Sequence, residues 1–262
     1  MQAVGPIVAP VQPSSGAAAA GWVMQNGLYV SLSAQVSLER RLETIANNVA
    51  NMNTVGFRGE GVRFSAELAK AGDSAVSYVS PGDSYISRQA GASMKTDNPF
   101  DVAIQGDGWM AIQTQSGIAY TRDGRMRMSE SGALETLIGN PVLDAGGAPI
   151  VLNPVGSTPS IGGDGMISQD GRQVGAIGLF SIDSQANLVR AENSGVIPDK
   201  PATPILDFTQ NGVAQGYVEG ANVNPIEEMT KLISLTRNFD GVNSEVAQTE
   251  SSMEDAIKTL AT

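Results

Sequence analysis

The sequence contains no cysteine and no histidine among its 262 residues. Without thiolate and imidazole side chains it cannot build the metal sites that depend on them, a cysteine nucleophile or a Ser-His-Asp triad. Aromatic residues are also scarce, at 5%. That scarcity argues against a carbohydrate-binding module, which needs several exposed aromatic rings.

Positive charge is in deficit as well. The net charge of −11 and the sequence pI near 4.4 make nucleic acid an unexpected partner. No apolar run is long enough to span a membrane, so we expect a protein that does not cross one. Residues 1–23 lack the basic start and unbroken apolar run of a secretory signal, and Pro6, Pro10 and Pro13 interrupt them. We predict a flexible N-terminal extension over residues 1–23, with Met24 as the more natural start.

Glycine, in contrast, is abundant, with 30 residues. Its pairs with Asp and Asn, such as Asp123-Gly124, Asp170-Gly171 and Asn211-Gly212, are turn signals, and we read Asp123-Gly124 as a hairpin. Such close spacing favours antiparallel pairing, because parallel crossovers need a dozen or more residues. The prediction is a β-rich central domain over residues 61–220, with Pro198–Pro204 as an extended connector. The expected strands are Val76–Val79, Tyr85–Ser87, Asp101–Ile104, Trp109–Gln113, Ile118–Thr121, Arg125–Met128, Ile150–Leu152, Met166–Ser168, Val174–Phe180, Leu188–Arg190 and Val213–Val218.

A helix is predicted before this domain. Its apolar residues alternate in steps of four and three, which places them on one narrow stripe suited to a partner helix. Asparagines between them favour turns over helix interiors, and Gly56 can supply the left-handed residue that ends the helix. The stripe, a predicted assembly seam, consists of Leu38, Leu42, Ile45, Val49 and Met52.

A second helix is predicted at the other end of the chain. Asn224 can cap it, Pro225 suits its first position, and Glu227 and Glu228 lie in the positively polarised first turn. Its apolar residues follow a heptad pattern. The predicted assembly seam of this helix consists of Leu232, Leu235, Phe239, Val242, Val246, Met253 and Leu260.

Together these patterns predict an α+β fold. The N- and C-terminal helices, in residues 24–60 and 221–262, form a coiled-coil-like assembly domain around a mainly antiparallel β domain. The alternative is that both helices simply pack on an ordinary globular core, since a heptad pattern does not say how many helices meet.

Candidates for chemistry are weak. A calcium loop after Asp123 would need oxygen ligands where Arg125 and Arg127 stand. The stretch 162–165 lacks both the strand–GxGxxG–helix order of a nucleotide loop and a P-loop lysine. Asp97, Asp101 and Asp107 lie close enough in sequence to pair as acid and base, but surface carboxylates explain them better. We therefore predict no catalytic residue, no cofactor and no metal.

Three segments resemble the bacterial flagellar rod and hook family. Thr44–Arg58, TIANNVANMNTVGFR, is similar to its N-terminal signature, ANNLAN followed by a spacer and GF. Thr96–Trp109, TDNPFDVAIQGDGW, resembles the family's first β-domain motif, and Gln215–Glu228, QGYVEGANVNPIEE, the start of its C-terminal helix. The matching motif residues are Ala46, Asn47, Asn48, Asn51, Gly56 and Phe57.

The resemblance implies a structural subunit exported through the flagellar type III apparatus. Its partners would be copies of itself and neighbouring rod subunits, in the periplasmic rod of the basal body. The segment around Trp109 resembles the proximal rod members, and a distal rod subunit is the alternative within the family. From another class, a periplasmic carbohydrate-binding or wall-modifying β protein remains the alternative.

Overall fold

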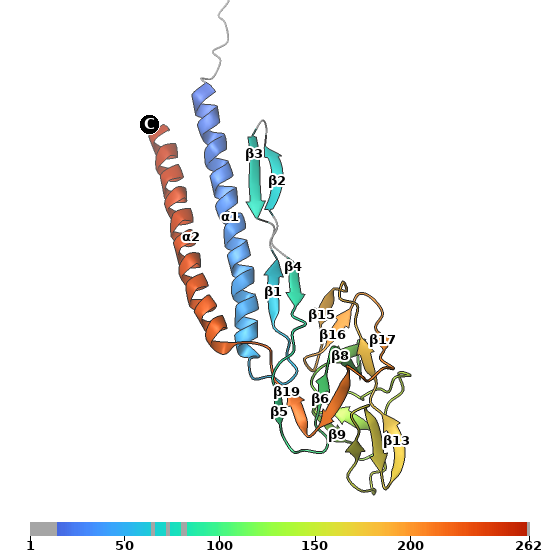
Figure 1. Cartoon of the computed structure of the whole chain (residues 1–262). Coiled ribbons are helices and arrows are strands. Elements are labelled where there is room, and N and C mark those ends of the chain that lie inside the picture. Colours follow the sequence, from blue (N-terminus) through green and yellow to red (C-terminus); the bar gives the residue numbers. More distant parts are fainter. Residues whose placement is uncertain (1–14, 64–65, 72–73, 80–82, 261–262) are drawn as a thin grey trace, which may run out of the picture. The chain divides into compact units, whose positions relative to one another are not determined.

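The computed structural model describes residues 15–63, 66–71, 74–79 and 83–260. It divides into two units. The first comprises Met1–Leu42, Phe64–Asp83 and Ser234–Thr262, and the second Glu43–Arg63 and Ser84–Ile233. In chain order the elements are helix α1 (Ser15–Ala50), a series of short strands and helix α2 (Pro225–Leu260), as Figure 1 shows in colours from blue to red. The predicted α+β class is confirmed.

Helix α1 begins earlier than the sequence suggested. It starts at Ser15, so the prediction of a flexible extension is wrong for residues 15–23, and residues 1–14 lie outside the described residues. Ser15 is a favourable residue at a helix start, and Ala17–Ala20 follow it, the residue type with the highest helix propensity. In the seam, Ile45 is buried, whereas Met52 lies beyond the end of the helix at Ala50.

Helix α2 begins where the sequence placed it. The side chain of Asn224 caps it, because its Oδ1 accepts hydrogen bonds from Ile226 N at 3.1 Å and from Glu227 N at 3.4 Å. Leu235 is 4% exposed and Phe239 is half-buried, whereas the side chains of Met253 and Leu260 lie outside the described residues. Pairing of this seam with that of α1 stays a prediction.

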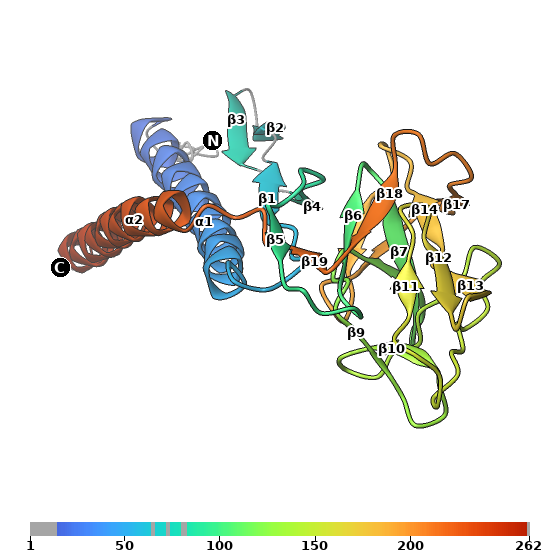
Figure 2. The same cartoon turned by 60° about the horizontal axis from the view of Figure 1, so that its bottom comes forward.

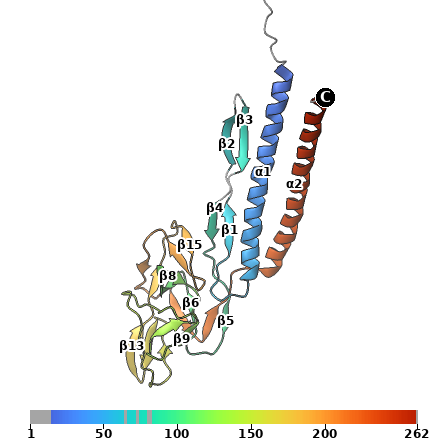
Figure 3. The ribbon, with the colours of Figure 1, turned by 180° about the vertical axis from the view of Figure 1, so that it is seen from behind.

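The strands are short and pair mostly antiparallel. In the first unit, β2 and β3 pair antiparallel, with Ala66 opposite Val79, and Figure 3 shows the two strands side by side. In the second unit, a six-stranded sheet has the order β15-β16-β8-β7-β14-β17 and a three-stranded sheet the order β11-β12-β13. Further pairs are β1-β4, β9-β10, β6-β18 and β5-β19.

The bounds of the strands are Glu60–Arg63 (β1), Ala66–Ala71 (β2), Ser74–Val79 (β3), Asp83–Ile86 (β4), Ser93–Lys95 (β5), Val102–Gln105 (β6), Trp109–Thr114 (β7), Gly117–Thr121 (β8), Met126–Met128 (β9), Leu134–Thr136 (β10), Ser160–Ile161 (β11), Met166–Gln169 (β12), Arg172–Ala176 (β13), Leu179–Ser181 (β14), Leu188–Arg190 (β15), Val196–Pro198 (β16), Thr203–Pro204 (β17), Gly212–Gln215 (β18) and Tyr217–Glu219 (β19). Figure 2 shows β6 beside β18 and β7 beside β14, the pairs that bring distant segments together.

The hydrophobic core of the second unit lies among these short strands. Side chains from β6, β7, β10, β12 and β14 meet there, together with residues of the irregular segment that follows β10. Fully buried examples are Val102, Met110, Ile112, Leu134, Val142, Ile167 and Leu179.

Four sequence predictions fail here. Asp123-Gly124 is not a hairpin, because β8 pairs with β7 and β16 whereas β9 pairs with β10. A Cβ on Gly124 would overlap Val102 O, so this glycine permits a close backbone approach. Two strands expected to be continuous are broken, one before Leu179 and the other at Gly216, whose φ is +78°. The segment Ile150–Leu152 makes only isolated bridges.

Candidate functional site

The segment that follows α1 and the segment that precedes α2 lie side by side in the second unit. Gly56 N donates to Glu219 O at 2.7 Å, and Asn222 N donates to Phe57 O at 3.2 Å. We call this meeting point the junction, defined by residues 45–60 and 217–228 and by the side chains that contact them. It joins the two family motifs that the sequence holds far apart.

Asn48 is the first anchor of the junction. Its Nδ2 donates to Glu60 O at 2.9 Å, and its Oδ1 accepts from Glu60 N at 2.8 Å. A single side chain thus pairs with both backbone groups of Glu60, as a neighbouring strand does. The same Nδ2 lies 3.3 Å from Glu228 Oε2 in the first turn of α2. Asn48 is 5% exposed, so these bonds satisfy a buried amide.

The other asparagines hold the turn after α1. Asn51 Nδ2 donates to both Asn47 O and Asn47 Oδ1 at 2.9 Å, and Thr54 Oγ1 donates to Asn51 Oδ1 at 3.2 Å. Gly56 has the predicted left-handed conformation, with φ of +69°, but it lies in the turn after the helix rather than at the last residue of the helix. Turn formation therefore accounts for Asn47 and Asn51.

A buried ionic cluster lies beneath this turn. Glu219 bridges two arginines, with Oε1 at 2.7 Å from Arg58 Nη2 and Oε2 at 3.0 Å from Arg122 Nη1. The three side chains are 0%, 2% and 4% exposed for Arg58, Arg122 and Glu219. Further hydrogen bonds run from Gly91 N to Glu219 Oε1 at 3.0 Å and from Arg122 Nη2 to Gly106 O at 2.6 Å. The cluster therefore connects the segment that follows α1 and the segment that precedes α2 to the β domain.

Trp109 packs against both guanidinium groups. Its ring centroid is 5.6 Å from Arg58 Cζ and 5.4 Å from Arg122 Cζ, distances typical of cation–π contacts. Burial lowers the pKa of Arg58 to about 10, while the nearby Glu219 carboxylate acts in the opposite direction. Burial likewise lowers the pKa of Arg122, again opposed by Glu219. A pKa near 10 keeps Arg58 charged at neutral pH, so the ion pair persists there.

Two more contacts fix the backbone of the motif. Asn222 Oδ1 accepts from Gly59 N at 2.6 Å, and its Nδ2 donates to Gln89 O at 2.6 Å. The guanidinium of Arg190 lies 4.5 Å from the Phe57 ring centroid and donates from Nη2 to Arg58 O at 2.7 Å.

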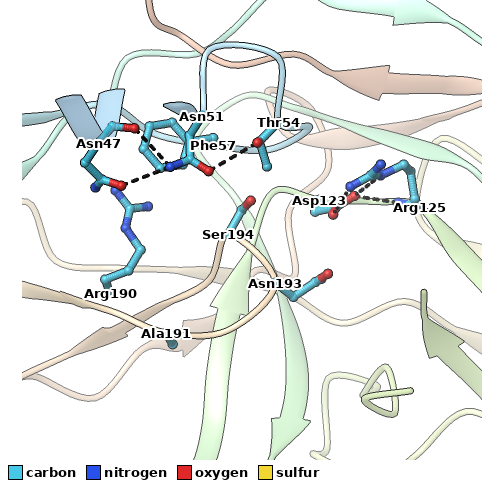
Figure 4. A pocket seen from close by; sticks show the side chains of 10 residues that line it. All are labelled: Asn47, Asn51, Thr54, Phe57, Asp123, Arg125, Arg190, Ala191, Asn193 and Ser194. Carbon is cyan, nitrogen blue, oxygen red and sulfur yellow. Dashed lines mark hydrogen bonds and ion pairs between the residues drawn. The ribbon is translucent and has the colours of Figure 1, made fainter. Parts of the chain in front are cut away.

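A polar pocket of about 370 Å³ opens beside the junction. Figure 4 shows its lining from the end of α1, from the segment that follows β8 and from the turn between β15 and β16. The lining residues are Asn47, Asn51, Thr54, Phe57, Asp123, Arg125, Arg190, Ala191, Asn193 and Ser194.

The structure places the predicted motif residues in the junction and most of the predicted seam residues along the two helices. The junction contains all six motif residues, of which only Ala46 is exposed. The seam residues other than Met52 lie on the two helices, and the role of the seams in assembly stays a prediction. The three aspartates weighed as an acid–base pair have separate surroundings. Lys95 pairs with Asp97 at 2.8 Å, Asn98 donates to Asp101 at 3.0 Å, and Asp107 is exposed.

Sequence reasoning missed the ionic cluster. Arg58 and Glu219 lie inside the quoted family motifs, but no role was predicted for them or for Arg122. For Arg58 and Glu219 the available signal was a position between apolar residues and glycines, as in Tyr217-Val218-Glu219-Gly220; Arg122, between Thr121 and Asp123, carries no such signal. Among the residues whose side chains the structure describes, no cluster of acidic residues suited to a metal ion is found, and no described helix is long and apolar enough to cross a membrane.

Comparison with known proteins places this architecture in a family. Residues 28–58 match the model described as flagella basal body rod protein. Residues 103–169 match the flagellar hook protein FlgE/F/G D1 domain. Residues 214–260 match the flagellar basal body rod FlgEFG protein C-terminal model. The first and third matches cover the two sides of the junction, and the second includes Trp109 and Arg122.

Relatives that are similar over the whole chain agree with these family matches. The flagellar basal-body rod protein FlgF of Mesorhizobium japonicum is 51% identical over 90% of this chain and 98% of its own length. FlgF of Rhizobium meliloti is 46% identical over the same shares. The rod protein FlgG of Bacillus subtilis is 32% identical over 86% of this chain and 95% of its own. The chain belongs to the flagellar basal-body rod protein family. The higher identities are to members named FlgF.

Proposed function

We propose that this protein is the FlgF-type structural subunit of the proximal rod in a bacterial flagellar basal body. In this role it is a building element and not an enzyme. It is exported through the flagellar type III apparatus and takes its place in the periplasmic driveshaft, between copies of itself and neighbouring rod subunits. The observation that carries the proposal is the 51% identity to a FlgF protein over nearly the full length of both chains.

The structure supports separate roles for two parts of such a subunit, the junction and the seam of α2. The junction anchors both helices to the β domain through a buried ionic cluster, so the ends of the chain are held where they leave that domain. Beyond the junction, α2 carries apolar residues at heptad spacing, and Val242 and Val246 remain half-buried rather than buried. We propose that neighbouring subunits complete this seam, as in a coiled coil.

The FlgG-type distal rod subunit is the second candidate. The FlgG relative of Bacillus subtilis at 32% identity favours it less than the FlgF relatives at 51% and 46% do. Complementation separates the two. We expect the gene to restore motility to a strain that lacks its own FlgF and not to one that lacks FlgG. Rescue of the FlgG-deficient strain alone would reverse the assignment.

Substitution of Phe239 tests the role of the seam. Phe239→Asp places a charge in the seam, so we expect rods to be lost while thermal melting of the purified monomer changes little. Asn238→Asp, at the adjacent exposed position, is the matched control and should assemble normally. If Phe239→Asp instead lowered the melting temperature by many degrees, the helix would already be packed in a globular core. The seam proposal would then fail.

A further inference from the structure

The pocket beside the junction has more hydrogen-bond donors than acceptors to receive them. Arg190 Nη1 and Asn193 Nδ2 are both buried atoms with no partner among the described residues. Asn47 Nδ2 also makes no hydrogen bond to a described residue, since Asn47 uses only its two oxygens, as acceptors from Asn51. Figure 4 shows the Asn47 side chain directed towards Arg190. Three N–H groups are therefore available to a ligand.

The carboxylates of the region are already engaged. Asp123 Oδ1 accepts from Arg125 Nε at 2.9 Å, and Asp123 Oδ2 accepts from Arg125 Nη2 at 2.7 Å. Glu60 Oε1 accepts from Arg190 Nε at 2.9 Å. Neither carboxylate accepts a hydrogen bond from the three unpaired donors of the pocket. An unpaired buried donor is unfavourable because it has lost its hydrogen bonds to water, so the pocket is suited to a group that brings oxygen acceptors.

Because the pocket offers three donors, a carboxylate suits it better as a ligand than a carbonyl group does. A carbonyl oxygen has two lone pairs, whereas a carboxylate has about four acceptor sites and is the preferred partner of a guanidinium. The donors also come from two separate elements, the end of α1 and the turn between β15 and β16. A carboxylate bound there would connect both elements to its own chain.

We propose that this pocket receives the side chain of an aspartate or glutamate from an adjacent rod subunit. The inference rests on the proposed function, because only assembly brings such a chain to the pocket. This protein itself carries the required group in excess, with 27 acidic against 16 basic residues. On α2, Glu245 and Glu250 are exposed and have no ion-pair partner among the described residues, so a second copy presents suitable carboxylates.

Substitutions at Asn47 test the chemistry. Asn47→Asp keeps the oxygen that accepts from Asn51 but replaces the Nδ2 donor with a negative oxygen beside Arg190. We expect this variant to lose rod assembly, measured as the yield of basal bodies from a strain with no other copy of the gene. Asn47→Ala removes the Nδ2 donor, and with it the Oδ1 that accepts from Asn51 Nδ2, without adding charge, and it should retain partial assembly. Equal yields from the two variants would contradict a carboxylate ligand.

Asn193 provides an independent test that spares the fold. It occupies a turn position with φ of +55°, which glycine adopts without strain, so Asn193→Gly removes the side-chain amide with its Nδ2 donor and leaves the turn unstrained. Asp170→Gly is the matched control, because Asp170 has φ of +54° at the first position of the turn between β12 and β13, away from the pocket. Among the described residues, only Ser157 N donates to its exposed side chain, at 3.1 Å. We expect Asn193→Gly to lower the yield of basal bodies and Asp170→Gly to leave it unchanged, with wild-type melting temperatures for both monomers.

Chemical protection reports occupancy directly. The chain has no cysteine, so Asn47→Cys introduces a unique thiol. We expect maleimide to label it in the monomer and not in purified basal bodies. Equal labelling in both states would overturn the proposal.

If Asn193→Gly assembles normally while Phe239→Asp does not, the pocket inference fails and the rod function stands. If deletion of the gene leaves basal bodies intact, the proposed function itself fails.

Discussion

Gly56 lies directly against the backbone of Asp123. A Cβ atom on Gly56 would overlap Asp123 N and lie 2.5 Å from Arg122 C, and its φ of +69° also favours glycine. Two independent constraints, one of conformation and one of space, therefore act at this residue. The close approach also brings the turn after α1 next to the arginine that binds Glu219.

We predict that Gly56→Ala destabilises the second unit strongly. The left-handed conformation alone costs an alanine about 1–2 kcal/mol, and the overlap with backbone atoms adds to this. Gly147→Ala is the control, because Gly147 has φ of +82° but a Cβ added there would meet no heavy atom within 4 Å. Urea unfolding of the purified chain provides the measurement. Equal loss of stability in the two variants would mean that the packing against Asp123 is unimportant.

Removal of the charge on Glu219 should also lower the stability of the folded chain. Glu219→Gln leaves two buried guanidinium groups without their shared counterion, and breaking a buried pair in this way typically costs about 3–5 kcal/mol. Asp183→Asn serves as the control, because the Asp183–Lys200 pair is 3.0 Å long but exposed on both sides. We expect a large drop in melting temperature for the first variant and a value near wild type for the second. A small effect of Glu219→Gln would show that other contacts hold the junction.

Asn48 offers a test of the amide contact to Glu60. Asn48→Asp keeps an acceptor for Glu60 N but loses the donor to Glu60 O and places a carboxylate near Glu228. We expect a loss of about 2 kcal/mol at neutral pH in urea unfolding. Asn53→Asp adds the same charge near the same helix end at an exposed site and should change little.

The Asn48 prediction also has a pH dependence. Repulsion by nearby oxygens raises the pKa of the introduced carboxyl group in the folded state, so its unfavourable contribution grows as pH rises above the unfolded value near 4. Below that pH the protonated group again donates a hydrogen bond. The difference in stability between Asn48→Asp and Asn53→Asp should therefore shrink on acidification. A constant difference from pH 7 to pH 4 would contradict this account of the contact.

Sequence reasoning succeeded where the controlling interactions are local. The cap at Asn224 and the start of α2 were predicted because an N-cap bonds to residues two and three positions ahead. The left-handed Gly56 and the hairpin at Asp170-Gly171 follow from the same kind of short-range rule. The start of α1 was misplaced because the prolines of residues 1–13 were given more weight than the alanines that follow them.

The strand pairing was harder to predict. Asp123-Gly124 has the composition of a hairpin turn, but the chain there passes from one sheet to another, and β9 finds its partner in β10. The choice of partner depends on which strands bury their apolar faces together. A two-residue signal carries no information on that.

By itself, the sequence determined the α+β class, the helix boundary at Asn224 and the family, since each depends on spacing along the chain. Only the tertiary structure decided that Glu219 would bind Arg122, 97 residues away in sequence, and that Asn222 would bind Gly59, 163 residues away. The physical reason is that a charged or amide side chain in a sequence looks like a surface residue. It becomes a buried anchor only where folding brings a matching group within about 3 Å and removes the water.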